Sequence, residues 1–174
     1  MDPVLETAFL KYSAGTLTQL AGRIETCLKM LDEEQIWARG SENENAVGNL
    51  VLHLSGNVRQ WIVSGVGNRP DVRERDKEFA ARAGLTGADL IARLRGTVQE
   101  AVATIEPLTP RQMAEMRTIQ GYSGTVMEAI YHVVEHFSMH TGQILFATKM
   151  LTGADLGFYR HLRNGTAPHN ETRP

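Results

Sequence analysis

The sequence has little of several features that would place it in a special class of protein. It holds one cysteine, Cys27, in 174 residues, so no disulfide can form within the chain. No stretch reaches the roughly 18 consecutive apolar residues of a membrane-spanning helix, and the N-terminus, with Asp2, has no apolar secretory run. The 18 Lys and Arg against 20 Asp and Glu leave a net charge of -2, without the basic excess that a phosphate backbone attracts. We therefore expect a cytoplasmic protein with neither nucleic acid nor membrane as its partner.

The sequence also lacks a convincing run of alternating or β-branched residues that would indicate strands. Four long segments instead carry apolar residues at a period near 3.6, which is typical of amphipathic helices. Hydrophobic residues make up 42% and charged residues 22%, as in ordinary globular domains. The pattern predicts an all-α fold, a four-helix bundle in a single domain over residues 1–165, followed by a loose tail at 166–174.

The expected long helices cover about residues 4–36, with a break near Ser13-Ala14-Gly15, and then 45–66, 86–105 and 125–151. Thr86 and Thr125 each open a capping-box pattern, and Thr109-Pro110 predicts one further short turn. Residues 69–82 hold five basic and four acidic residues, which indicates a solvated connection. Residues 155–164 predict a short helix that packs Leu156, Phe158 or Tyr159, and Leu162 on the bundle. Cys27 lies in the apolar stripe of the first helix, where we expect an inert buried thiol rather than a catalytic one.

Three histidines recur every four residues in HVVEHFSMHTGQI, residues 132–144. His132 and His140 would lie about 12 Å apart along a helix, so one metal ion can use only a neighbouring pair. Stepping about 100° per residue, His136 and His140 lie nearest the apolar face, whereas His132 lies toward the rim. The sequence therefore predicts His136 and His140 as a ligand pair and His132 as a surface or supporting residue.

The other pair, in His132-Val133-Val134-Glu135-His136, matches the H-x-x-E-H motif of some zinc peptidases. Those enzymes need a further acidic ligand downstream. After His136 the acidic residues are Asp155, just beyond the helix, and Glu171 in the tail. The motif therefore does not predict a peptidase.

A third ligand is expected from the second helix. Leu50, His53, Leu54, Asn57 and Trp61 recur at helical spacing, which places His53 within an apolar stripe. A buried imidazole needs a partner, either a hydrogen-bond acceptor such as Asn57 or a metal. Its pairing with an inward H-x-x-x-H on another helix favours a three-histidine metal site. Gln143 could hydrogen-bond a ligand at that site or simply lie at its polar rim.

LVLHLSGNVRQWI and, after a variable connection, YHVVEHFSMHTGQILFATKML resemble the DinB/YfiT-like superfamily of metalloenzymes, in an uncharacterised DinB-like branch. The resemblance runs from the first helix to about residue 163 and implies His53, His136 and His140 as metal ligands. Many members have Arg before the Gly-Gln pair, where this chain has Thr141, so a substrate-binding role of that Arg does not carry over to this chain.

The resemblance implies a metal-dependent enzyme in which an activated low-molecular-weight thiol attacks an electrophilic small molecule. Imidazole ligands suit several metals; zinc is expected on availability, with nickel second. The alternative is a non-catalytic metal-binding or stress-response bundle protein. Long amphipathic helices and the resemblance both suggest a homodimer, although no residue pattern identifies its interface.

Overall fold

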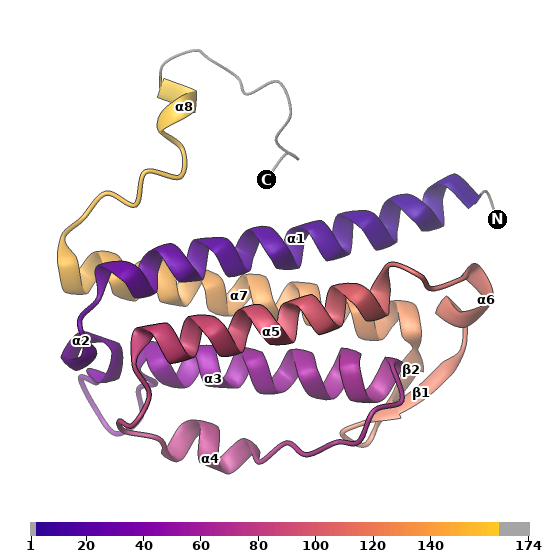
Figure 1. The fold of residues 1–174 in the computed structure, drawn as a ribbon, viewed down its shortest axis with the longest axis horizontal. Coiled ribbons are helices and arrows are strands. Elements are labelled where there is room, and N and C mark those ends of the chain that lie inside the picture. The colour runs from indigo at the N-terminus through magenta and orange to yellow at the C-terminus, as the bar shows by residue number, and fades with distance from the viewer. Residues whose placement is uncertain (1–2, 164–174) are drawn as a thin grey trace.

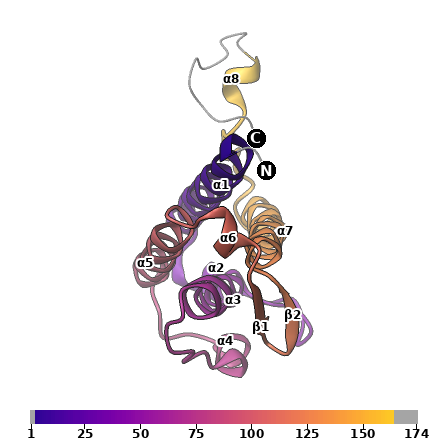
Figure 2. The same ribbon diagram turned by 90° about the vertical axis from the view of Figure 1, so that its right-hand side faces the viewer.

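The computed structural model describes residues 3–163 (Figure 1). Four long helical segments form its body: α1 (Pro3–Met30), α3 (Val47–Val58) continued by the π-helical η1 (Arg59–Val66), α5 (Gly87–Ile105) and α7 (Val126–Thr152). Viewed from the end, α1 and α3 occupy opposite corners of a square, with α5 and α7 at the other two (Figure 2). The predicted four-helix bundle is confirmed.

The boundaries of the later helices follow their capping residues. The Thr86 side chain accepts a hydrogen bond from the Asp89 backbone N–H, and Thr125 accepts one from that of Glu128. In both cases the acidic side chain accepts a hydrogen bond from the backbone N–H of the capping threonine, as a capping box requires. Helix α7 is capped at its C-terminus by Gly153, whose φ of 65° is readily adopted by glycine.

The first two helical segments differ from the expectation. Helix α1 runs through Ser13-Ala14-Gly15 without a break and ends at Met30, because Asp32 caps a separate short helix, α2 (Glu33–Trp37). The second segment stays helical to Val66, but its last eight residues adopt π-helical geometry. Gly67 N–H donates to the Ile62 carbonyl at 2.8 Å, five residues back.

The expectation of no strands is wrong for one short hairpin. Strands β1 (Met116–Ile119) and β2 (Tyr122–Thr125) pair antiparallel, with Ile119 opposite Tyr122. Gln120 and Gly121, between them, have φ of 53° and 81°, the left-handed values that a two-residue hairpin turn needs. Gln120 stands where Asn or Asp would have signalled such a turn, so the sequence pattern did not reveal it.

Shorter helices complete the described chain: α4 (Arg75–Ala80), α6 (Pro110–Met113) and α8 (Arg160–Arg163). The predicted turn after Thr109 is α6. Near the C-terminus, Leu156 is buried and Phe158 packs against the core, but Leu162 is 66% exposed, so its predicted packing is wrong. The tail predicted at 166–174 lies outside the described residues.

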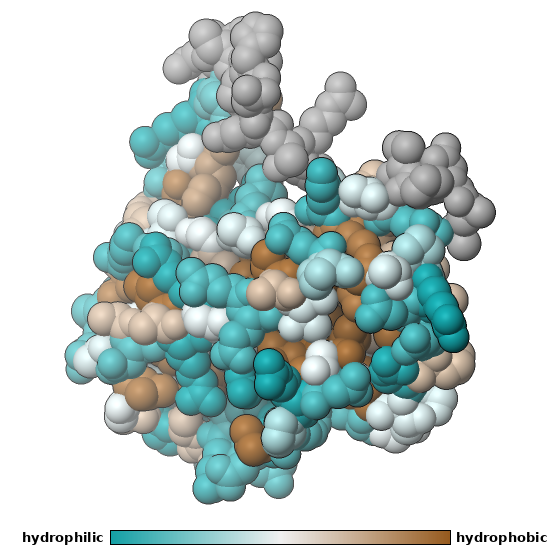
Figure 3. Space-filling model, turned by 45° about the vertical axis from the view of Figure 1, so that its right-hand side comes forward, coloured by the Kyte–Doolittle hydropathy of each residue, from teal (hydrophilic) through white to brown (hydrophobic). Residues whose placement is uncertain are grey.

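The core lies between the four long segments, where large side chains such as Leu17, Ile24, Leu54 and Phe137 are fully buried. Cys27 is also fully buried, and this burial raises the pKa of its thiol. Hydrophilic side chains predominate on the face seen in Figure 3, with hydrophobic ones showing between them. None of the described helices has the length and apolar character to cross a membrane.

Candidate metal centre

The bundle brings His53 of α3 together with His136 and His140 of α7. His53 Nε2 lies 3.1 Å from His136 Nε2, which lies 3.2 Å from His140 Nε2. One ligand atom from each ring falls within 4.8 Å of the others. His53 is buried and the other two are half-buried. Two helices that are far apart in sequence therefore supply three imidazole nitrogens to one point.

The far side of the His53 ring is held by two charged residues. Its Nδ1 lies 3.2 Å from Glu78 Oε2 and 3.1 Å from Arg73 Nη2. Arg73 also forms a bidentate ion pair with Glu78, both bonds being 2.8 Å long. When Nδ1 carries the ring proton it donates to Glu78, and Nε2 then presents its lone pair to the cluster. A carboxylate in this position is the usual support of a metal-binding histidine.

The ring of His140 is supported in the same way, but by an uncharged side chain. Its Nδ1 lies 2.6 Å from Gln143 Oε1, which can accept the ring proton and leave Nε2 free. Of the two roles considered for Gln143, the structure supports the hydrogen bond to a cluster histidine. His136 Nδ1, by contrast, is buried without a hydrogen-bond partner.

The surroundings of His136 and His140 favour the uncharged form of both rings. The pKa of His136 is lowered to about 3, mainly by burial. Smaller contributions come from the nearby rings of His140, His53 and His132 and from Arg73. Burial also lowers the pKa of His140, despite the opposing effect of the hydrogen bond that its ring makes to Gln143 Oε1. Burial alone would raise the pKa of Glu78, but its hydrogen bonds and attraction to Arg73 and His53 bring it below its ordinary value. Near neutral pH the site therefore combines uncharged His136 and His140 rings with a charged Glu78 carboxylate behind the His53 ring.

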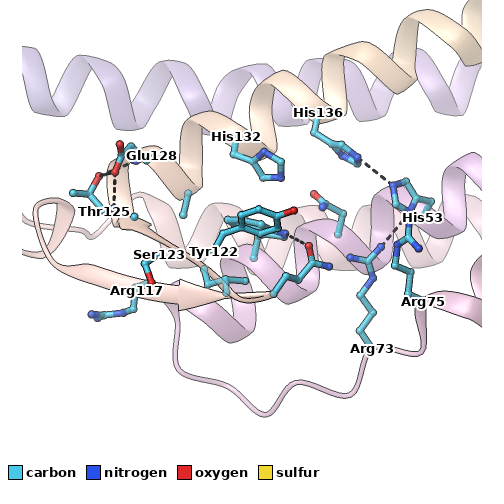
Figure 4. Close-up of a pocket in the computed structure, with 16 residues that line it drawn as sticks. His53, Arg73, Arg75, Arg117, Tyr122, Ser123, Thr125, Glu128, His132 and His136 are labelled. Carbon is cyan, nitrogen blue, oxygen red and sulfur yellow. Dashed lines mark hydrogen bonds between the residues drawn. The ribbon is translucent and has the colours of Figure 1, made fainter.

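His132 lies beside the cluster without joining it. Its ring packs on Trp61, with centroids 4.2 Å apart, and is 5.7 Å from the His136 ring by the same measure. Figure 4 shows His132 and His136 projecting from α7 on the side that faces His53. The expected division between two inward histidines and one at the rim matches this placement. Glu135 is exposed, so it does not reach the cluster as the base of a peptidase motif would.

A pocket with a volume of about 490 Å³ opens next to the cluster, with His53, His132 and His136 in its wall. Trp61, from η1, and Tyr122, from the hairpin, also line it. Gln120 ties the hairpin to this wall, because its Oε1 accepts a hydrogen bond from Trp61 Nε1 at 3.2 Å. The hairpin therefore closes one side of a cavity whose other side is the histidine cluster.

The segment that carries Glu78 is anchored to α3 by a buried amide. Asn49 Nδ2 donates to the backbone carbonyls of Glu78 and Ala81 at 2.8 and 2.9 Å. Arg39 adds hydrogen bonds to Asn49 Oδ1 and to the Phe79 carbonyl. These contacts anchor α4 to α3 at Asn49, which lies one helical turn before His53 on α3.

Sequence reasoning missed Arg73 and Glu78, because both lie in the segment expected to be a solvated connection. Most charged residues of 69–82 are indeed exposed, yet Glu78 is only 7% exposed and the Arg73 side chain only 4%. The sequence signal for this pair was weak, because Glu78 is one carboxylate among nine charged residues of alternating sign and is distinguished only by its neighbour Phe79. The expected burial of His53 was the better indication, because a buried imidazole needs a hydrogen-bond partner.

A sequence model for a family described as a protein of unknown function, DUF1572, matches residues 5–162. No curated protein sequence matches this chain.

Two solved structures share the fold. One, a conserved protein from Enterococcus faecalis, aligns with a TM-score of 0.72 at 13% identity, covering 83% of this chain and 97% of its own. The other, a DinB-like protein from Bacillus cereus, aligns with a TM-score of 0.63 at 15% identity, covering 80% and 89%. The predicted DinB-like fold is therefore confirmed, while identities this low carry no residue roles across.

Proposed function

The chain belongs to the DUF1572 family, and from its histidine cluster we propose that it is a metal-dependent enzyme that joins a low-molecular-weight thiol to an electrophilic small molecule. The observation that carries the proposal is the meeting of His53, His136 and His140 Nε2 beside a pocket. We assign these three residues as the metal ligands.

The donor set fits a divalent metal ion. Two imidazole nitrogens around a tetrahedral zinc lie about 3.3 Å apart, given bonds of roughly 2.0 to 2.1 Å. The two Nε2 to Nε2 distances of 3.1 and 3.2 Å are close to that value. Glu78 and Gln143 each orient one ring with its Nε2 toward the site. We infer zinc from availability, with nickel as the second choice, since imidazole suits both.

A metal held by these three imidazoles would have an open position, where it would lower the pKa of a bound thiol or water. The protein's own Cys27 is buried and its thiol pKa is raised, so the nucleophilic sulfur must come from a cosubstrate. The residues of the chain then have simple tasks. Glu78 holds the Nδ1 proton of His53, while Trp61 and His132 form the wall against which the substrates are placed.

A non-catalytic metal-binding protein is the second candidate. It is favoured by the pocket wall, where the carboxylate of Glu128 is engaged by Thr125 N–H and Oγ1 at 2.6 and 2.8 Å. That carboxylate is therefore poorly placed to act as a general acid or base.

Thiol consumption by the metal-loaded protein tests the proposal. We would incubate it with cysteine and a panel comprising an epoxide, an aryl halide and an unsaturated ketone, and follow free thiol. The wild type and His161→Ala, a histidine variant outside the cluster, should consume thiol equally. His53→Ala should lose this activity while keeping the helical circular dichroism of the wild type. Stoichiometric metal without any turnover on this panel would favour the binding protein instead.

A further inference from the structure

The pocket beside the histidine cluster carries an arginine that no carboxylate neutralises among the described residues. Three arginines line this pocket: Arg73, Arg75 and Arg117. Arg73 forms a bidentate ion pair with Glu78, and Arg117 Nη2 pairs with Glu115 Oε2 at 2.8 Å. Arg75 forms no ion pair within residues 3–163. Its guanidinium instead lies over the Phe79 ring, 4.8 Å from the centroid.

Arg75 lies close to the proposed metal ligands. The Phe79 ring under its guanidinium packs in turn on the His53 ring, with centroids 4.8 Å apart. Figure 4 places Arg75 at the His53 end of the pocket, whereas Arg117 lies at the opposite end near Ser123. A group bound by Arg75 would therefore belong to a molecule whose other end can reach the cluster.

Asn57 provides a second polar group in the same pocket wall that lacks a hydrogen-bond partner. It follows His53 by one turn of α3, lines the pocket and is only 4% exposed. Its Oδ1 is buried without a hydrogen-bond donor. Leaving a buried carbonyl oxygen unpaired costs about 1 to 3 kcal/mol, so a protein seldom retains one unless something else satisfies it.

We propose that this pocket binds a small molecule that carries one carboxylate, paired with Arg75, and a hydrogen-bond donor directed at Asn57 Oδ1. The inference rests on the proposed function and deepens it, because the thiol cosubstrate then belongs to the class of amino acid-like thiols. A guanidinium matches a carboxylate with two parallel hydrogen bonds. A doubly charged phosphate fits less well, since Arg73 and Arg117 are already paired.

Matched thiols isolate the contribution of Arg75. β-Mercaptopropionate and β-mercaptopropionamide have the same length and differ in charge. We would measure their dissociation constants by calorimetry on zinc-loaded wild type and Arg75→Gln, with Arg111→Gln as control. Arg111 is exposed on α6 and does not line the pocket. The preference for the charged thiol should fall about tenfold or more in Arg75→Gln, return in part in Arg75→Lys, and persist in Arg111→Gln.

Cysteine adds an amino donor to β-mercaptopropionate and so isolates Asn57. The gain in affinity from that donor should shrink in Asn57→Leu, while the urea midpoint of this variant stays equal to or above that of the wild type. Inorganic phosphate added as a competitor should displace β-mercaptopropionate no better than acetate does. Stronger displacement by phosphate would assign the site to phosphate compounds and overturn the carboxylate proposal.

Metal content separates this inference from the proposed function. If zinc binds at one equivalent but Arg75→Gln leaves the charge preference unchanged, the inference fails and the metal site stands. If no metal binds, the proposed function fails, and the same thiol pair is titrated into metal-free protein. Loss of the charge preference in Arg75→Gln would then still support the carboxylate site. A wild type that shows no preference for the charged thiol would overturn the carboxylate site.

Discussion

Helices α1 and α3 lie at opposite corners of the bundle and are buried in different ways. From Leu17 to its end, α1 buries only apolar residues and Cys27, along one stripe. Every residue of α3 is buried, and four of them are polar: Asn49, His53, Ser55 and Asn57. Buried polar groups lower stability unless they are satisfied, so their concentration on one helix indicates that this helix serves a site.

The contrast predicts that a substitution in the apolar stripe of α1 lowers stability but leaves metal binding unchanged. Ile24→Ala, in the α1 stripe, should lower the free energy of unfolding by about 2 to 5 kcal/mol, because it leaves a cavity in the core. The folded variant should bind as much metal as the wild type. Urea denaturation and elemental analysis check both, with Leu5→Ala, 68% exposed on α1, as the nearly neutral control. Loss of metal from folded Ile24→Ala would break the comparison.

The support of His53 gives the next largest effect. Glu78→Gln removes the charge behind Nδ1 but keeps the shape of the side chain, so metal affinity should fall about 10- to 100-fold. Competition with a chromogenic chelator measures the change. Glu74→Gln is the matched control, because Glu74 pairs with Lys77 in an exposed ion pair outside the cluster. Equal affinities for the two variants would mean that Glu78 has no part in holding the ligand.

The smallest effect concerns pH. The pKa of His136 is about 3 in the folded protein against 6.5 for an ordinary imidazole, so between these values the unfolded chain holds a proton that the folded protein lacks. Stability of the metal-free protein is thus complete above about 6.5 and falls as the pH is lowered below it. Urea midpoints between about pH 6.5 and 5, above most carboxylate titrations, should show a shallower slope in His136→Gln. Parallel slopes would contradict a neutral His136.

The sequence was sufficient for those parts of the molecule that depend on local pattern. Helix α7 follows from the Thr125 capping box and its apolar period, and the same period separated His136 and His140 from His132. The hairpin and the Arg73–Glu78 pair were missed because they depend on contacts between distant segments. Gln120 adopts a left-handed conformation that its residue type does not favour, and Glu78 is buried where Asn49 holds α4 against α3.

The central claim is that His53, His136 and His140 bind one metal ion. Elemental mass spectrometry of the purified wild type, His53→Ala, His132→Ala, His136→Ala and His140→Ala tests it directly, with circular dichroism to verify folding. We predict about one equivalent in the wild type and in His132→Ala, and its loss in the other three. A wild type that neither contains nor takes up metal, or a His132→Ala variant that loses it with the rest, would contradict the claim.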